Sequence, residues 1–406
     1  MTWKSPHPAA TLQIYSNRRP PHNPVKTGLY VHIPFCGRKC PYCDFFSTTD
    51  FSLISAFQKA LALEINQRGQ RCREVDTIYF GGGTPSAVPV EVITCTLAAI
   101  RADFSVSADC EITVEVNPES VTPEKMAAFK GAGINRVSMG LQSFSDRNLR
   151  LLKRPHSAEE SRRAYEHVRA AGFTDISLDL IYGLPGQSAS GWRRDLETAV
   201  GLGPEHLSCY TLTYEPRTVF DQRLKKGLLQ PLDEGKVSEL FLLTVDFLSG
   251  RGYVQYEISS FARFNPLDQQ RFVSRHNAKY WTFAPYLGLG PAAHSFTENT
   301  RSWNVPSVRR YIKKMKTRGS AMADSEALSR PQQMMEALYL GLRTSDGIHK
   351  ESFNARFGAD FDALFGKTLV FLKKEGLVDL KSGRCLLTRQ GMLVLDAVVQ
   401  KLIMNF

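Results

Sequence analysis

The 406-residue chain lacks any apolar run long enough to cross a bilayer, and it is poor in cysteine. A membrane-spanning helix needs about 20 apolar residues in a row, and no window here comes close. Eight unevenly spaced cysteines are too few for a disulfide framework. The N-terminal residues have no apolar run followed by the small-residue cleavage site of a secretory signal. With 43% apolar and 22% charged residues, the composition predicts a soluble globular protein of the cytoplasm.

Residues 1–28 have no acidic side chain, although they hold four basic residues and five prolines. An acid-poor start is a feature of organelle transit peptides, but those form amphipathic helices, which five prolines oppose. We therefore expect a flexible, basic and proline-rich leader ahead of the first folded element.

Acidic residues are also missing between Arg301 and Arg318, a stretch with seven bases, and the whole chain carries a formal charge of +11. Such patches attract anions, which include nucleic acid, phospholipid surfaces and small polyanions such as a porphyrin dicarboxylate. A solvated helix face explains the same pattern more simply, and we favour it. The sequence leaves open both a peripheral membrane contact and a homodimer.

From Leu29 onward, short β-branched apolar runs alternate with amphipathic helical stretches. Six strand–helix units in a row predict a parallel sheet with right-handed crossovers, either open or curled into a barrel. We expect an α/β fold, a partial (β/α)6 barrel of the TIM type, over residues 29–265. The predicted strands are 29–33, 76–80, 111–116, 135–139, 175–181 and 206–212, and the predicted helices are 51–68, 88–102, 122–131, 157–171, 189–201 and 233–250.

Beyond residue 265 the alternation stops. Residues 266–326 form an aromatic segment that ends in the basic stretch, and residues 327–406 look like a separate helical module. The order of elements in this module suggests a winged-helix-like unit, a type that often reads DNA. Its bases do not line one helix, so we expect a packing or lid role and no nucleic-acid partner. The predicted elements are helices from Pro331, over 351–365 and over 366–375, a hairpin over 378–387 and a closing helix from Thr388.

Unusual polar, glycine and cysteine residues fall at the carboxyl ends of all six predicted strands. In parallel βα folds these ends meet on one face, where such folds place their chemistry. We therefore expect residues that are far apart in the sequence to share one cavity. They are Cys36, the glycine-rich segment 81–85, Glu115, Gln142, Asp179 and Thr211.

Three cysteines, Cys36, Cys40 and Cys43, follow the first predicted strand at the spacing C-x3-C-x2-C. Three close thiolates repel one another unless a cation or a metal cluster neutralises them. Structural zinc needs four ligands, and only Asp44 or a distant residue is available as the fourth. A 4Fe-4S cluster held by three cysteines has one iron open for another ligand. The triplet therefore predicts such a cluster, and a zinc-stabilised nucleic-acid-binding protein is the alternative from a different class.

The other cysteines are isolated in the sequence. Isolated cysteines behave mostly as small apolar side chains, so we expect each of them to be buried. They are Cys72, Cys95, Cys110, Cys209 and Cys385.

The cysteine triplet after the first strand and Gly-Gly-Gly-Thr-Pro at 81–85 after the second resemble the radical S-adenosylmethionine (SAM) superfamily. The resemblance implies that the open iron chelates the amino and carboxylate groups of SAM. It also implies that an electron, supplied by a reductant through the cluster, splits the sulfonium to give a 5'-deoxyadenosyl radical. The residues suit such a site, because glycine lets the backbone approach a ligand and arginine can fork onto a carboxylate. The predicted SAM-binding residues are Tyr30, Tyr42, Gly82, Gly83, Thr84, Pro85, Glu115, Gln142, Arg154, Asp179, Thr211 and His294.

A narrower resemblance runs from about residue 29 to residue 400. The strings DLIYGLPG at 179–186 and YEISSFA at 256–262, with the C-terminal module, are similar to the oxygen-independent coproporphyrinogen III dehydrogenase group. One departure is Ser260, where relatives usually have asparagine. The dehydrogenase has a further cysteine two residues beyond the triplet, whereas this chain has Phe45. As an enzyme of that type, the protein would use the radical to abstract hydrogen from a porphyrinogen propionate.

Within that group, HNAKYW at 276–281 resembles the HNxxYW signature of the haem chaperones. The resemblance implies haem as bound cargo, with His276 as the iron ligand, and delivery to haem-accepting proteins, those of the respiratory chain among them. Tyr280 and Trp281 would supply a flat apolar wall for the macrocycle. From the residues alone, the alternative is a structural role, in which His276 hydrogen-bonds to a backbone carbonyl and Trp281 anchors the loop. Phe45 and this motif favour a haem chaperone with a SAM-ligated cluster and no catalytic residues over a dehydrogenase.

Overall fold

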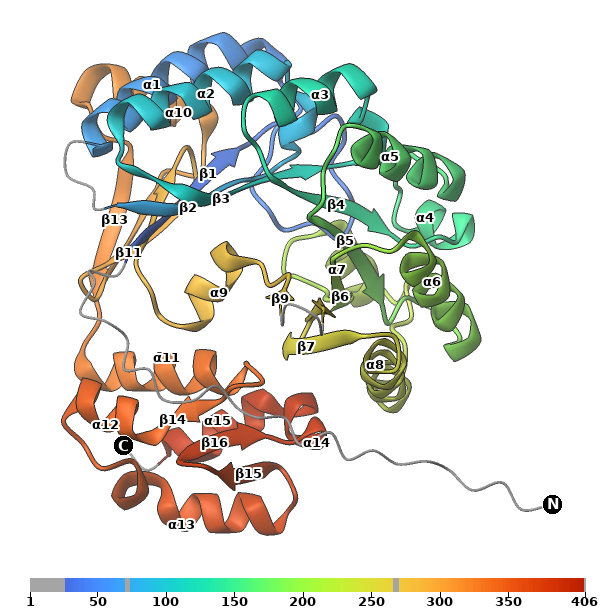
Figure 1. Cartoon of the computed structure of the whole chain (residues 1–406), viewed down its shortest axis with the longest axis vertical. Coiled ribbons are helices and arrows are strands. Elements are labelled where there is room, and N and C mark those ends of the chain that lie inside the picture. Colours follow the sequence, from blue (N-terminus) through green and yellow to red (C-terminus); the bar gives the residue numbers. More distant parts are fainter. Residues whose placement is uncertain (1–25, 70–73, 266–269, 405–406) are drawn as a thin grey trace.

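The computed structural model describes residues 26–69, 74–265 and 270–404 of the chain. The expected leader lies outside the described residues except for its last three positions, and Cys72 lies outside them as well. The described part forms one large curved sheet with helices on its outer side and a smaller helical unit next to it (Figure 1). None of the described helices is long and apolar enough to span a bilayer.

The first six strands lie where the hydrophobic pattern predicts them, and each pairs in parallel with the next. Central side chains such as Val31 and Phe80 are fully buried, as expected of parallel strands that are covered on both faces. The predicted fold class, a partial α/β barrel with parallel strands, is confirmed. The strands are β1 (Thr27–Ile33), β2 (Val75–Gly82), β3 (Val106–Val116), β4 (Arg136–Gln142), β5 (Ile176–Tyr182) and β6 (His206–Thr211).

The helices between these strands also follow the prediction, and capping side chains set where several of them begin. Thr122 accepts a hydrogen bond from the backbone N–H of Lys125, and Ser157 forms a capping box with Glu160. Two short helices, α4 (Asp146–Leu151) and α7 (Val219–Lys225), add to the predicted set. The others are α1 (Ile54–Gly69), α2 (Val90–Asp103), α3 (Pro123–Gly131), α5 (Ala158–Ala170), α6 (Ala189–Leu202) and α8 (Glu234–Ser249).

The sheet continues beyond the six predicted strands and has 13 strands within the described part of the chain. Next to β6, the antiparallel strands β8 and β7 extend one side, and β9 pairs with β8. Next to β1, strand β10 is parallel, and β11, β12 and β13 follow it in antiparallel order. The order of strands is an open path, so the barrel does not close. The added strands are β7 (Tyr253–Glu257), β8 (Ser260–Asn265), β9 (Gln270–Arg271), β10 (Tyr286–Leu289), β11 (His294–Thr297), β12 (Thr300–Asn304) and β13 (Met322–Ala327).

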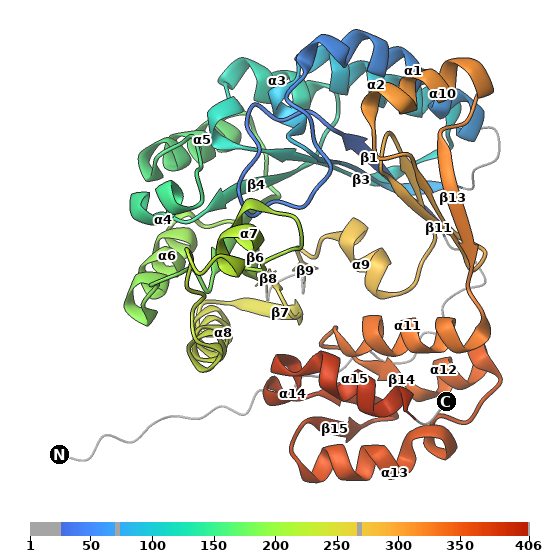
Figure 2. The same cartoon turned by 180° about the vertical axis from the view of Figure 1, so that it is seen from behind.

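The aromatic segment expected over residues 266–326 is therefore built largely into the edge of the sheet, which crosses the boundary expected at residue 265. Its first helix, α9 (Arg275–Trp281), lies on the concave side of the sheet in both views (Figures 1 and 2). Its second helix, α10 (Val308–Arg318), buries Tyr311 and Met315 and packs beside α1. Most of its basic side chains are exposed, which fits the solvated-face interpretation of the basic stretch.

The C-terminal unit has a hydrophobic core of its own. Its second and third helices divide earlier than predicted, because Gly358 ends one in the left-handed region and Asp360 caps the next. The hairpin is present, and β14 adds a third strand to it. The elements are α11 (Arg330–Leu342), β14 (Ile348–His349), α12 (Lys350–Phe357), α13 (Phe361–Lys374), β15 (Val378–Lys381), β16 (Arg384–Leu387), α14 (Arg389–Leu393) and α15 (Leu395–Ile403).

Candidate functional site

The loop after β1 carries the three clustered cysteines, and the glycine-rich segment after β2 packs directly against it. The N–H of Gly83 donates to the carbonyl of Ile33 at 2.8 Å, and the N–H of Thr84 donates to Phe35 at 2.7 Å. A Cβ on Gly83 would lie only 2.6 Å from the Phe35 carbonyl oxygen, so no larger residue fits there. The Thr84 hydroxyl lies 3.3 Å from Sγ of Cys36. The two motifs therefore form one structural unit at the carboxyl ends of neighbouring strands.

The cysteines of this loop are free and partly buried. Burial raises the pKa of the Cys43 thiol to about 11 and also raises the pKa of Cys36, and the neighbouring thiols add to both effects. Thiolates at this position therefore need positive charge close by, which an iron–sulfur cluster or a metal ion supplies.

The donor set suits a cluster better than a single metal ion. Across the described residues, no three His, Cys, Asp or Glu side chains converge as one metal ion would require. A Zn²⁺ ion with Zn–S bonds of about 2.3 Å brings its sulfurs close together, whereas a 4Fe-4S cluster takes each thiolate on a different iron. In the described part of the chain, the cysteine loop is therefore not arranged around a single metal ion.

Arg154 connects the cysteine loop to the sheet. Its Nη1 lies 3.6 Å from Sγ of Cys40, and its Nη2 donates to Asn117 Oδ1 at 2.6 Å and to the carbonyl of Gly140 at 2.9 Å. Its buried Nε has no hydrogen-bond partner among the described residues. The guanidinium is therefore held firmly while one donor stays available for a ligand carboxylate.

Glu115 lies on the concave side of the sheet, close to the glycine-rich segment. Its carboxylate accepts hydrogen bonds from the Tyr79 hydroxyl at 2.8 Å and from the N–H of Gly82 at 3.2 Å. Burial raises its pKa to about 7, and the nearby Asp179 carboxylate contributes to this shift. The predicted ribose-binding carboxylate is thus already paired with donors of the protein.

Asp179 faces the same space from β5. Its carboxylate accepts from the hydroxyls of Ser138 at 2.9 Å and Ser177 at 3.3 Å, and burial raises its pKa. Gln142 ends β4 with a φ of 69°, next to an irregularity in the pairing with β5. We call this space the lumen and define it by Tyr30, Tyr79, Glu115, Gln142 and Asp179.

Tyr42 lies on the cysteine loop and Tyr30 on β1. The Tyr42 hydroxyl bonds to Cys40, and the Tyr42 ring packs on Phe220 of α7 at 6.3 Å between centroids. The Tyr30 hydroxyl lies 3.2 Å from Nδ1 of His32. Both tyrosines therefore belong to the same region as the cysteines and the lumen.

Two predicted SAM residues lie apart from this group. Thr211 pairs in register with Tyr182 and bonds to its hydroxyl, whereas its neighbour Tyr210 lies near Asp179. Because side chains alternate along a strand, the side chain of Thr211 lies on the face opposite to Asp179. His294 is exposed on β11 and stacks on Trp303 at 5.8 Å, and no described contact joins it to the lumen residues.

His276 of the HNxxYW motif is buried on α9, with 1% of its surface exposed. Its Nδ1 lies 2.9 Å from the Thr77 hydroxyl, and its Nε2 lies 2.9 Å from the Tyr280 hydroxyl. Burial lowers its pKa to about 3, with a further contribution from Lys279. The structural alternative for His276, a hydrogen bond to a backbone carbonyl, is wrong about the partner. Both ring nitrogens bond to side-chain hydroxyls instead.

Trp281 faces a different neighbour from the other two motif residues. Its ring lies under the guanidinium of Arg343 from the C-terminal unit, at 4.6 Å. Tyr280 instead packs edge-on against His276 and Tyr286. The two aromatic rings predicted to form one flat wall are therefore inclined at 66° to each other.

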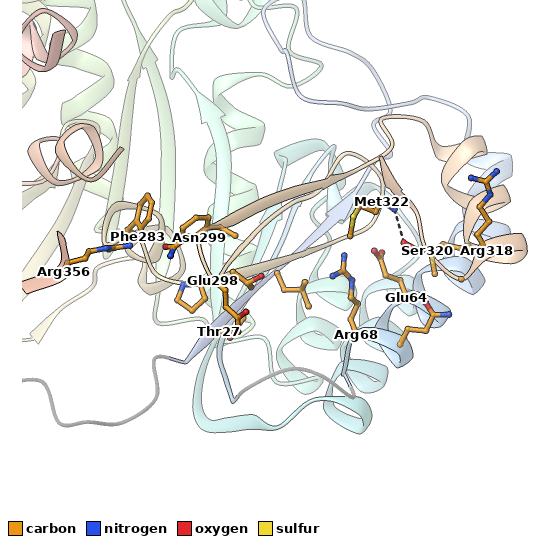
Figure 3. Close-up of a pocket in the computed structure, with 17 residues that line it drawn as sticks. Thr27, Glu64, Arg68, Phe283, Glu298, Asn299, Arg318, Ser320, Met322 and Arg356 are labelled. Atoms are coloured by element: carbon orange, nitrogen blue, oxygen red, sulfur yellow. Dashed lines mark hydrogen bonds between the residues drawn. The ribbon is translucent and has the colours of Figure 1, made fainter. Parts of the chain in front are cut away.

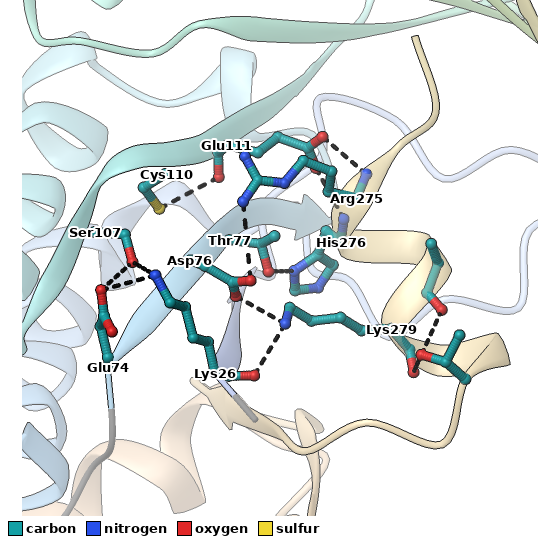
Figure 4. Close-up of polar contacts among 12 residues, drawn as sticks. Lys26, Glu74, Asp76, Thr77, Ser107, Cys110, Glu111, Arg275, His276 and Lys279 are labelled. Carbon is teal, nitrogen blue, oxygen red and sulfur yellow. Dashed lines mark hydrogen bonds and ion pairs between the residues drawn. The ribbon is translucent and has the colours of Figure 1, made fainter. Parts of the chain in front are cut away.

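Sequence reasoning missed the residues that hold α9 in place (Figure 4). Glu111 of β3 accepts hydrogen bonds from the backbone N–H groups of Arg275 at 2.8 Å and His276 at 2.9 Å. Asp76 of β2 pairs with Lys279 at 2.7 Å. A signal for Glu111 was present, because it lies four residues before Glu115 on the same strand and hence on the same face.

A second feature that the sequence did not reveal is a large cavity outside the lumen (Figure 3). It has a volume of about 1070 Å³ and extends from Arg318 at the end of α10 to Arg356 of α12. None of the predicted site residues lines it.

The isolated cysteines behave largely as expected. Cys110, Cys209 and Cys385 are buried, but Cys95 is exposed on α2, so the expectation for it is wrong. Its position falls on the outer side of an amphipathic helix, whose buried residues are Val92, Ile93, Thr96, Leu97 and Ile100.

An open parallel barrel with three clustered cysteines after β1 and a glycine-rich segment after β2 defines a radical SAM protein. In agreement, residues 30–199 match the Radical SAM superfamily and residues 328–394 match the HemN C-terminal domain. The solved structure of coproporphyrinogen III oxidase (HemN) from Escherichia coli is similar over 94% of this chain and 91% of that one, with a TM-score of 0.80 and 25% identity.

Comparison with related proteins assigns the chain to one family within this superfamily. It is 34% identical to heme chaperone HemW of Bacillus subtilis over 371 residues, which cover 90% of this chain and 96% of that protein. It is 34% identical to heme chaperone HemW of Mycobacterium tuberculosis over 382 residues, 93% of this chain and 94% of that one. It is 32% identical to the mouse mitochondrial protein named radical S-adenosyl methionine domain-containing protein 1, over 93% of this chain and 88% of that one. The chain belongs to the HemW family of the radical SAM superfamily.

Proposed function

We propose that this protein binds haem and transfers it to haem-accepting proteins, and that it carries a 4Fe-4S cluster and SAM beside the haem-binding motif. The observation that carries the proposal is the position of α9. The helix with the HNxxYW motif lies on the concave side of the sheet, where His276 stacks on the lumen residue Tyr79 at 5.1 Å. Cargo and cofactor would thus share one side of the sheet.

The cluster would be held by Cys36, Cys40 and Cys43. Thr84 and Arg154 contact the first two of these sulfurs and would stabilise them as thiolates. When bound, the cluster supplies the single electron that radical SAM chemistry needs. The remaining predicted SAM ligands lie on the cysteine loop, on the glycine-rich segment and in the lumen, and they are Tyr42, Gly82, Gly83, Pro85, Tyr30, Glu115, Gln142 and Asp179.

Haem would be the cargo, with His276 as the iron ligand. Imidazole is a common axial ligand of haem iron, and the surrounding tyrosines and Trp281 offer apolar surface to a macrocycle. The acceptors belong to the class of proteins that take up haem, including those of the respiratory chain.

A coproporphyrinogen III dehydrogenase activity is the second candidate, and the similarity to the HemN structure favours it. Phe45 argues against it, since the residue is 66% exposed at the position where the dehydrogenase has its additional cysteine.

The experiment that separates the two functions is a haem titration run beside a porphyrinogen assay on anaerobically reconstituted protein. We expect saturable haem binding at one site, and we expect no protoporphyrinogen from SAM, reductant and coproporphyrinogen III. His276→Ala should weaken binding or change the haem spectrum, whereas His294→Ala, which removes an exposed imidazole, should do neither. Porphyrinogen turnover, or a spectrum that His276→Ala leaves unchanged, would contradict the proposal.

A further inference from the structure

The hydrogen bond between His276 and Tyr280 follows from their spacing. Residues four apart on a helix lie on the same face, and the Tyr280 hydroxyl comes within 2.9 Å of the His276 Nε2. Because both residues belong to α9, this bond stays intact even if the helix shifts as a body. Nε2 is therefore occupied by a group of the same helix.

The other side of the imidazole is held by the sheet. Nδ1 bonds to the hydroxyl of Thr77, which is fully buried on β2. The Tyr79 ring stacks on the imidazole at 5.1 Å and 26°. At Gly28 on β1, an added Cβ would approach Cε1 of His276 to 3.3 Å and the Thr77 hydroxyl to 2.9 Å. The ring thus has two polar partners, one stacking partner and little room to turn.

The whole helix is anchored in the same way. The carboxylate of Glu111 is 5% exposed and accepts from two N–H groups in the first turn of α9. Lys279 pairs with Asp76 and also donates to the carbonyl of Lys26 at 2.9 Å. Together with the Thr77 bond, five contacts from β2, from β3 and from Lys26 just before β1 therefore fix the position in which the imidazole is presented.

An imidazole binds iron through the lone pair of an unprotonated nitrogen, and the other nitrogen commonly bonds to a group that sets the tautomer. Neither nitrogen of His276 is free for iron in this structure. We propose that Tyr280 gates His276: its hydroxyl occupies Nε2, the nitrogen that would bind haem iron, while Thr77 holds Nδ1 and keeps the ring oriented. This inference rests on the proposed haem-binding function.

The gate is the hydrogen bond between the Tyr280 hydroxyl and Nε2, and the opposite ring nitrogen bonds to a second hydroxyl, that of Thr77. The Tyr280 hydroxyl therefore competes with haem iron for Nε2 of His276. The ring of Tyr280 still offers apolar surface to the macrocycle. This gives Tyr280 a different role from the wall that its position in the motif suggests.

Tyr280→Phe tests the gate directly, because it keeps the ring and removes only the hydroxyl. Losing a competing hydrogen bond of ordinary strength should tighten haem binding by about fivefold. The control is Tyr286→Phe, because the ring of Tyr286 lies 4.7 Å from that of Tyr280 and its hydroxyl forms no hydrogen bond with His276 in the described part of the chain. Unchanged haem affinity in Tyr280→Phe would mean that Tyr280 supplies only apolar surface. Weaker haem binding would mean that its hydroxyl helps His276 to bind haem. Either result overturns the inference.

Thr77→Val tests the holding group, because valine preserves the branched shape without the hydroxyl. We expect haem binding to weaken by about fivefold, with a changed absorption spectrum, and we expect Thr77→Ser to restore both. A valine variant that binds haem as the wild type does would remove Thr77 from the inference. If the valine variant fails to fold, the serine and phenylalanine variants still decide the question.

A measurement without haem separates this inference from the proposed function. In ¹⁵N-histidine-labelled protein, Tyr280→Phe should shift the Nε2 resonance of His276 and leave Nδ1 close to its wild-type value. Absence of haem binding in the wild type would refute the function and leave this resonance test intact. Haem binding that depends on His276 but not on the Tyr280 hydroxyl would refute the gate alone.

Discussion

The guanidinium of Arg343 lies 4.6 Å above the indole of Trp281, which ends the helix that carries the haem-binding motif. The same side chain pairs with Glu257 of β7, with 2.9 Å between Nε and Oε2. One arginine of the C-terminal unit thus contacts both α9 and the sheet. The unit predicted to act as a packing element or lid is joined to the barrel at this point.

Arg343→Ala should destabilise the protein. Glu257 is 1% exposed, and a buried carboxylate that loses its cation costs about 3 kcal/mol or more. Urea denaturation at neutral pH would measure the free energy of unfolding. Glu257→Gln in the same background should recover part of the loss, because it removes the unpaired charge. A loss below about 1 kcal/mol would show that solvent reaches the carboxylate.

Replacing any one of Cys36, Cys40 and Cys43 by alanine should abolish the bound iron and sulfide and the broad charge-transfer absorption of the cluster. Iron and sulfide analysis of anaerobically purified protein would measure the change. Cys95→Ala is the matched control, since this thiol is exposed on α2. Iron retained at wild-type stoichiometry in a triplet variant, or stoichiometric zinc in place of iron, would contradict the cluster assignment.

Glu111→Gln should loosen α9. The amide keeps only one acceptor oxygen for the two N–H groups of the first turn and loses the negative charge favoured at a helix N-terminus. Hydrogen exchange of peptides covering residues 275–281 should accelerate, with a loss of about 1–2 kcal/mol in local opening free energy. Glu159→Gln, an exposed residue on α5, should leave this exchange unchanged. Equal exchange rates in the Glu111 variant and the wild type would mean that other contacts are sufficient to hold α9 in place.

Glu115→Gln should change the dependence of stability on pH. Burial raises the pKa of Glu115 from 4.5 to about 7, so between these values the folded protein holds a proton that the unfolded chain releases. Wild-type stability therefore falls as pH rises through this window. The glutamine variant lacks this loss, so its stability relative to wild type should rise by about 2 kcal/mol from pH 4.5 to 7 and then level off. Urea denaturation across that range would measure it, and a flat difference would mean that Glu115 titrates normally.

Local patterns account for most of what the sequence predicted correctly. Strands β1 to β6 and their helices follow from hydrophobic period and capping residues, which depend on near neighbours. The cysteine triplet and the glycine-rich segment are likewise short motifs, and the structure brings them together at Cys36 and Thr84. The side chain of Thr211 lies on the face opposite to Asp179, and a motif position at a strand end does not reveal which face a side chain occupies.

Strands β10 to β13 were missed because they are only four to six residues long, and because β10 pairs with a strand that is distant in the sequence. Strand β10 lies parallel to β1, with Leu287 opposite Leu29. No local hydrophobic periodicity in the sequence predicts such a pairing, because the pairing depends on how the sheet curves and where the chain returns to it. The division between α12 and α13 at Gly358 was missed because the flanking apolar residues continue a helical period across it.

What the sequence determined by itself is the chemistry that the chain can hold: three thiols on one loop, glycines beside them and an imidazole four residues before a tyrosine. Only the tertiary structure decided what each group meets. His276 bonds to Thr77 across 199 residues of sequence, and Arg154 reaches Cys40 across 114. Those contacts depend on sheet register and curvature, which result from packing the whole core and cannot be read from any short stretch of residues.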